Sequence, residues 1–259
     1  MTTSAAVQSA VQSGAKPVYI TGPATTAVGV MFIPNTVTAI AGLLLYQPIL
    51  AGPDYLINGA ASQGRIALGA LMELTLVVTA IGTAIGLFPY LKHYGERIAL
   101  GHIFFRFMET VMIGMGIVSV LSLLSLSQDF VAAGAPDASA YHAAGSLLLA
   151  VHTWTFMLGP LLFLGVNTLC YSSLLYKSRL VPRPLAVLGL AGAMLVFCDA
   201  LLVLFGVAPQ LSVLVSLLAL PIAVYEMILA GWLIVKGFNA SAIISAPATV
   251  ATSEQTLAA

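Results

Sequence analysis

Long apolar runs separated by short polar segments make up most of this chain. The runs lie at about residues 27–50, 66–91, 98–126, 144–171, 185–207 and 211–235. A helix of about 20 apolar residues crosses the hydrocarbon core of a bilayer. These runs are too long and too uniformly apolar for barrel strands, and a helix satisfies its own backbone in lipid. The pattern predicts an all-α polytopic membrane protein with six transmembrane helices.

The two ends of the chain have a different composition from the apolar runs. Residues 1–23 and 238–259 are rich in small and polar residues, which is typical of disordered segments. We therefore expect a disordered N-terminal tail at 1–23, a six-helix transmembrane domain at 24–237 and a disordered C-terminal tail at 238–259.

Basic residues alternate along the polar segments in a way that predicts orientation. The segments 51–64, 127–142 and 208–210 contain no Lys or Arg. The basic residues of the other segments are Lys16, Lys92, Arg97, Lys177, Arg179, Arg183 and Lys236. Because cytoplasmic loops carry the excess of Lys and Arg, both termini are expected in the cytoplasm.

Composition excludes several classes of function. The chain is 60% hydrophobic and 7% charged, whereas soluble domains carry about 25% charge. So few charges cannot cover a surface in water, so membrane lipids are the expected surroundings. A net charge of zero argues against a nucleic-acid partner. Cys170 and Cys198 lie in apolar runs and are interpreted as core residues. No nucleotide-binding, zinc-protease or nucleophile-elbow motif occurs, so no cofactor, metal or catalytic set is assigned.

Several ionisable residues nevertheless lie inside the apolar runs. An ionised side chain at mid-bilayer costs on the order of 2.5–3.5 kcal/mol, so such residues should face a bundle interior or a wet cavity. The candidates for binding a small ligand or protons are Arg106, Glu109, Glu226, Asp199, Glu73, His152 and His102. Four carboxyls then accompany one arginine and two histidines. Some carboxyls must therefore be protonated, or paired with a protonated histidine or a bound cation.

Spacing adds detail to this set. His102, Arg106 and Glu109 are separated by four and then three residues, so they form one stripe on a helix. His102 is expected near the headgroups. Asn167 is expected to bond another helix, and Gly82 with Gly86 indicates close helix packing. The two halves of the chain would have opposite orientations, which allows a weak 3+3 inverted repeat.

Four segments together resemble a family of bacterial integral-membrane proteins, domain of unknown function 4386. They are "PDYLINGAASQGRIALGALMELTLVV", "LFPYLKHYGERIALGHIFFRFMETVMIGMGIVSVLSLLSLS", "LLYKSRLVPRPLAVLGLAG" and "YEMILAGWLIVKGFN", within about 53–238. The resemblance implies a six-helix protein of the bacterial cytoplasmic membrane. It implies no activity. The positions that match the characteristic polar and aromatic residues of the family are Arg106, Glu109, Asp199, Glu226, Trp232 and Lys236.

Three functions remain open from the sequence. The first is a polar cavity that binds or transports a small ligand, coupled to protons. The second is an intramembrane enzyme that acts on a lipid or isoprenoid through acid–base pairs such as Glu109 with Asp199 or Glu226. The third is a structural or accessory protein whose buried charges only fix helix packing. A non-enzymatic role is favoured, and the sequence predicts no oligomeric state.

Overall fold

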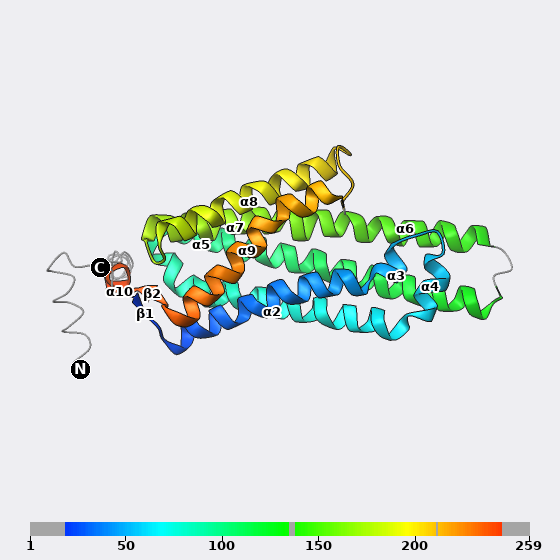
Figure 1. Ribbon diagram of the computed structural model, residues 1–259, viewed down its shortest axis with the longest axis horizontal. Helices are drawn as coiled ribbons and strands as arrows, with labels where there is room; N and C mark the ends of the chain where they lie inside the picture. Colours follow the sequence, from blue (N-terminus) through cyan, green and yellow to red (C-terminus); the bar gives the residue numbers. More distant parts are fainter. Residues whose placement is uncertain (1–18, 135–137, 211, 245–259) are drawn as a thin grey trace, which may run out of the picture.

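Helices make up nearly all of the residues that the computed structural model describes, which are 19–134, 138–210 and 212–244 (Figure 1). The predicted all-α fold is confirmed. The elements are β1 (Tyr19–Ile20), α2 (Pro23–Leu45), α3 (Gln47–Leu50), α4 (Tyr55–Ala61), α5 (Gln63–Ala132), α6 (Ala138–Phe156), the π-helix η1 (Met157–Phe163), α7 (Leu164–Ser178), α8 (Arg183–Leu204), α9 (Val213–Val235), β2 (Phe238–Asn239) and α10 (Ala240–Ile244).

Within this described part of the chain, five helical segments are long and apolar enough to cross a membrane. They are α2, α5, the continuous run Ser139–Ser178, α8 and α9. Six spans, cytoplasmic termini and an inverted repeat stay predictions.

The helix α5 consists of two helices that meet at Gly95. This residue has non-helical dihedral angles, φ 166° and ψ 81°, within a segment of 70 residues. We call residues 63–94 the first arm of α5 and residues 96–132 the second arm. A hydrogen bond from Arg106 to the carbonyl of Ala80 joins the arms, so they lie side by side. The reversal falls between the predicted apolar runs 66–91 and 98–126.

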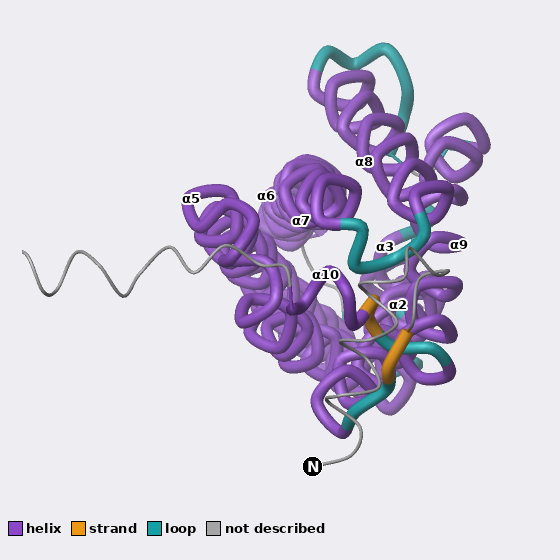
Figure 2. Tube along the Cα trace, turned by 90° about the vertical axis from the view of Figure 1, so that its left-hand side faces the viewer, coloured by secondary structure: helices purple, strands orange, loops and turns teal. Residues whose placement is uncertain are grey.

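One end of the molecule collects both basic turns and the two strands, and we call it the basic end. Lys177 Nζ donates to the carbonyl of Tyr94, 3.1 Å away, which ties the turn after α7 to the turn within α5. Tyr19 pairs with Asn239 in the antiparallel ladder of β1 and β2. The amide of Asn239 also donates to the carbonyl of Leu180 at 2.9 Å. Figure 2 looks onto this end and shows both strands beside the ends of α2 and α9.

The opposite end, which we call the far end, is built from α3, α4 and the adjoining ends of α5 and α6 (Figure 1). The polar segment 51–64 was expected only to separate two apolar helices, but the structure has α4 there and begins α5 at Gln63. Tyr55 and Leu56 of α4 are buried, so this short helix is held by packing. Ser127 Oγ donates to the carbonyl of Leu56 and fixes α4 against the second arm of α5.

Glycine and proline positions shape the helices near the site. The glycines of the first arm of α5 accept α2 closely, as expected: a Cβ added at Gly82 would lie 2.6 Å from Met31 Sδ. Gly159 and Pro160 lie within the π-helix η1. Proline has no backbone N–H to donate, and a π-helical turn is one way in which a helix accommodates this.

The ranges 1–23 and 238–259, expected to be disordered tails, lie mostly outside the described residues. Their described parts include β1, β2 and α10. Phe238 is fully buried, and its ring packs 4.7 Å from that of Tyr90, centroid to centroid.

Candidate functional site

A buried ion pair lies at the centre of the helix bundle. Arg106 and Glu109 are separated by three residues in the second arm of α5, so their side chains lie on the same face. Arg106 Nη1 donates to both carboxylate oxygens of Glu109, at 3.1 Å and 3.0 Å. The two residues are only 2% and 3% exposed. The stripe predicted from the spacing therefore carries a buried ion pair.

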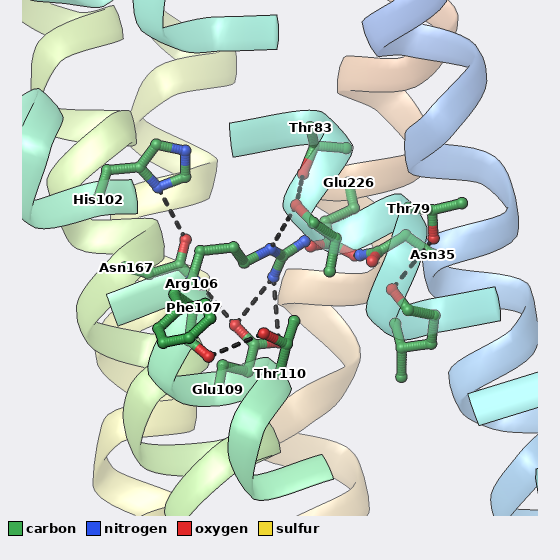
Figure 3. Close-up of polar contacts among 12 residues, drawn as sticks. Asn35, Thr79, Thr83, His102, Arg106, Phe107, Glu109, Thr110, Asn167 and Glu226 are labelled. Carbon is green, nitrogen blue, oxygen red and sulfur yellow. Dashed lines mark hydrogen bonds and ion pairs between the residues drawn. The ribbon is translucent and has the colours of Figure 1, made fainter. Parts of the chain in front are cut away.

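The guanidinium of Arg106 also binds the backbone of the neighbouring arm of α5. Its Nε donates to the carbonyl of Ala80 at 3.3 Å. The hydroxyl of Thr83 donates to the same oxygen at 2.7 Å. Figure 3 shows the arginine reaching from one arm of α5 to the other. This contact fixes the register of the two arms at the depth of the ion pair.

A second chain of hydrogen bonds reaches Glu109 from α7. Asn167 Nδ2 donates to Glu109 Oε2 at 2.7 Å. The Oδ1 atom of Asn167 lies 3.0 Å from His102 Nδ1. His102 is 1% exposed, so its side chain is buried within the protein, and its position near the headgroups stays a prediction. Asn167 bonds another helix, as predicted.

Glu226 of α9 approaches the same centre from the opposite side (Figure 3). Its Oε2 atom accepts a 2.7 Å hydrogen bond from Thr36 and a 3.5 Å hydrogen bond from Asn35, both on α2. Its Oε1 atom has no hydrogen-bond partner among the described residues. Among the described residues Arg106 forms its ion pair with Glu109, and the hydrogen bonds of Glu226 go to α2 instead.

A cavity of about 210 Å³ lies next to this network. Three of its wall residues are acidic: Glu73 from the first arm of α5, Glu109 from the second arm and Glu226 from α9. Asn35 and Thr36 supply further polar groups. The other wall residues are apolar: Ala39, Ile40, Leu43, Leu76, Ile113, Phe156, Pro160, Leu161, Leu164, Ala219, Ile222 and Ala223.

His152 lies near Glu73 on a different side of the bundle core. The two residues line a second, small cavity of about 10 Å³ together with Thr155 and Gly116. The ring of Tyr46, which follows α2, packs edge-on against His152 with the centroids 6.2 Å apart. Glu73 thus borders both cavities.

Asp199 is not among the residues that line the cavity. Its helix α8 packs against α7, η1 and α9 at one side of the bundle (Figure 1). Asp199 is 0% exposed, and neither of its carboxyl oxygens has a hydrogen-bond partner in the described part of the chain. Of the seven candidates, Glu73, Glu109 and Glu226 share the main cavity. Arg106 bonds Glu109 directly, and His102 is linked to Glu109 through Asn167. His152 lines the small cavity with Glu73, and Asp199 lines neither cavity.

Asn35 and Thr36 are wall residues that the candidate set did not contain. Asn35 is recognisable in the sequence as a polar residue after Pro34 inside an apolar run, whereas threonine is too common in membrane helices to be informative. Within the described residues, no group of three or more His, Cys, Asp and Glu side chains could hold a metal ion. The carboxyl groups of the cavity wall could accept hydrogen bonds, exchange protons and attract a positive charge.

Comparison with known families gives one match. The family described as "Domain of unknown function (DUF4386)" matches residues 27–237, which includes every residue of the network described above. Neither the search of curated proteins nor the search of solved structures found a match.

Proposed function

The chain belongs to the DUF4386 family, and we propose that it binds a small, mostly apolar molecule with a cationic or hydrogen-donating group, in exchange for protons. The observation that carries this proposal is the meeting of Glu73, Glu109 and Glu226 at one cavity. Three separate helical segments deliver these carboxyls into an otherwise apolar pocket. A purely structural role would not require the acids to share a space.

The charge of the wall determines the class of ligand. Arg106 is committed to Glu109 and to the carbonyl of Ala80, so it offsets about one carboxylate. Glu226 Oε1 is buried and without a partner among the described residues, so a donor on an incoming ligand would satisfy it. A bound ammonium group would supply that donor. Without a cation a second buried carboxylate is costly, so the empty cavity would hold a proton. The bound ammonium group would replace that proton, which would leave the cavity.

The size of the cavity limits the ligand. An apolar cavity of about 150 Å³ accommodates benzene. The cavity here, at about 210 Å³, therefore suits a single ring with a short amine arm. The apolar wall would hold the ring, and the carboxyls would orient the amine.

The arrangement of the helices and of the two ends of the molecule supports a particular membrane topology. We propose six spans, with the two arms of α5 as separate spans and the basic end in the cytoplasm of a bacterium. The described edges of both terminal segments lie at that end, where they pair as β1 and β2. Both basic turns lie there as well, in agreement with the charge rule. Arg65, near the start of α5 at the far end, is the exception to the alternation.

An intramembrane enzyme is the second candidate, and one observation favours it. Ile40 lines the cavity and is 54% exposed, so the cavity wall continues onto the outer surface of α2, where lipid would lie. A lipid or isoprenoid could then reach Glu109 and Glu226 from the bilayer. Mass spectrometry of membrane lipids incubated with the protein tests this role. A product that is lost with Glu226→Gln would favour the enzyme.

Proton release on ligand addition tests the main proposal. Benzylamine hydrochloride is titrated into the detergent-solubilised protein in weak buffer with a pH indicator, and benzyl alcohol is the neutral control. The wild type is expected to release protons in a saturable way with the amine only. Glu226→Gln should lose this release, and Ala223→Leu, which fills the cavity without removing an acid, should lose it too. Glu96→Gln, at an exposed position in the turn, should leave it unchanged.

Two results would overturn the proposal. One is the absence of saturable proton release from the wild type. The other is equal release by the amine and the alcohol, because the carboxyls would then have no part in recognition.

A further inference from the structure

Glu73 separates two cavities of very different size. On one side is the main cavity, which it shares with Glu109 and Glu226. On the other is the small cavity of about 10 Å³, which it shares with His152 and Thr155. Glu73 itself is 7% exposed. Its carboxyl group is therefore the polar link between the two spaces.

The small cavity has the size and the polar groups to hold one water molecule. A buried water needs about 10–15 Å³ of this kind of volume and two to four polar partners. Glu73, His152 and Thr155 supply them. The hydroxyl proton of Thr155 is directed to the carbonyl of Val151 at 2.9 Å, so its oxygen remains free to accept a hydrogen bond. Gly116 completes the wall and leaves room that a side chain would occupy.

The small cavity lies further from the basic end than the ion pair does. Along the arms of α5, Glu73 is about 33 Å and Glu109 about 21 Å from Gly95, at about 1.5 Å per residue. His152 is similarly about 39 Å from Ser178 along the helical run. Buried apolar clusters fill the bundle on both sides of this level. One includes Leu87 and Leu91 on the basic side, and the other includes Ile66 and Phe130 on the far side.

We propose that His152 and Glu73, bridged by one water, form the route by which protons travel between the far end and the main cavity. In the inward direction, an N–H bond of the His152 imidazolium breaks and its proton passes to the water. The water passes a proton to the Glu73 carboxylate, which leaves a neutral imidazole and a carboxylic acid. Glu73 then exchanges protons with the acids of the main cavity. This route rests on the proposed function in one respect, which is that ligand binding would be the event that uses the protons.

The charged and titratable groups around Glu73 are compatible with such a relay. Tyr46 interacts with it from the end of α2, although its hydroxyl makes no hydrogen bond of regular geometry with any described residue. Glu109 and Glu226 face it across the main cavity, and His152 faces it across the small one. Arg106 lies behind Glu109 and is already bonded to it. His152 is thus the basic neighbour of Glu73 on the side of the small cavity.

Rapid-mixing infrared spectroscopy after transfer of the purified protein into D₂O tests the route without any ligand. The carboxylic acid band that disappears in Glu73→Gln identifies the Glu73 proton. A positioned proton donor is worth 10²–10⁴-fold in rate, so His152→Gln should slow deuterium exchange of this band about 100-fold. Gly116→Ala should slow it too, because its Cβ would lie 3.2 Å from Thr155 Oγ1 and 3.7 Å from His152 Cδ2. His93→Gln, at an exposed position of the basic end, is the matched control and should exchange like the wild type.

Exchange at the wild-type rate in both His152→Gln and Gly116→Ala would overturn the route, since the Glu73 proton would then have another path. The route also fails if no acid band disappears in Glu73→Gln, because Glu73 would then carry no proton to exchange. Neither result depends on amine binding. The route and the proposed function can therefore fail separately.

Discussion

Asn167 Nδ2 donates a 2.7 Å hydrogen bond to Glu109 Oε2, and this bond determines which nitrogen of His102 carries the proton. With its NH₂ group on the carboxylate, Asn167 presents Oδ1 to His102, and an oxygen can only accept. His102 Nδ1 must therefore be the donor across the 3.0 Å contact. Its Nε2 atom then faces the protein interior without a partner among the described residues.

Replacement of Asn167 tests this arrangement. Asn167→Leu keeps the volume but leaves a buried Nδ1–H and one carboxylate oxygen without their partner. We expect the free energy of unfolding to fall by about 1–3 kcal/mol. The measurement is unfolding in mixed micelles of mild detergent and SDS, followed by circular dichroism. Thr110→Val is the control, because among the described residues that hydroxyl bonds to a carbonyl of its own helix. Its cost should be smaller. Equal costs would show that the Asn167 bonds contribute nothing specific.

A double-mutant cycle at the ion pair makes a second prediction. Arg106→Met leaves Glu109 buried without its cation, which typically costs 3–5 kcal/mol. Glu109→Met removes the carboxylate instead and leaves the cation. The double variant should cost about 1–3 kcal/mol less than the sum of the single variants. The same unfolding assay measures the coupling. Additive costs would mean that the two charges do not depend on each other.

Two kinds of feature could be predicted from the sequence: the helical spans that any chain needs in lipid, and contacts between residues close together on one helix. Helical spans follow because lipid offers no partners to the backbone. The contact of Arg106 with Glu109 follows from a spacing of three residues within one helix. The partners of Glu226 did not follow, because Thr36 lies 190 positions away and meets it only through the packing of α2 on α9. Nothing local to either helix encodes that encounter.

Asp199 and α4 show the same limit. A carboxyl in an apolar run predicts that the side chain is buried, but it does not predict which residues surround it. Asp199 is buried at the side of the bundle, away from the cavity that collects the other acids. The helix α4 has only seven residues, too few for an apolar period to stand out from a loop. Tertiary packing around Tyr55 and Leu56 makes it a helix.

The third prediction concerns the path of the chain through the membrane. In a background with Cys170→Ala and Cys198→Ala, single cysteines are placed at the exposed positions Glu96, Lys177, Asp54 and Ala133. If the arms of α5 are separate spans, a membrane-impermeant maleimide added to intact cells should label Asp54→Cys and Ala133→Cys only. Glu96→Cys and Lys177→Cys should react only after the cells are opened. Labelling of positions 54 and 96 from the same side would contradict the six-span topology.

The last prediction concerns the contact that holds α2 against α9. A Cβ at Gly29 would lie 2.9 Å from the carbonyl oxygen of Ala230, and a backbone oxygen cannot rotate away. Gly29→Ala should therefore push the helices apart and lower the free energy of unfolding by about 1–3 kcal/mol. It should also weaken the bond between Thr36 and Glu226, because Thr36 lies about two turns further along α2.

Gly231 of α9 supplies the matched control, because nothing lies within 4 Å of a Cβ added there. Gly231→Ala should leave stability unchanged or raise it by up to about 1 kcal/mol, as expected for a glycine replaced in an open helical position. Both variants are compared in the SDS unfolding assay and by proton release with benzylamine. A Gly29→Ala protein as stable as the Gly231→Ala protein would mean that α2 and α9 can separate there without cost. The position of Glu226 in the cavity wall would then have to be held by other contacts.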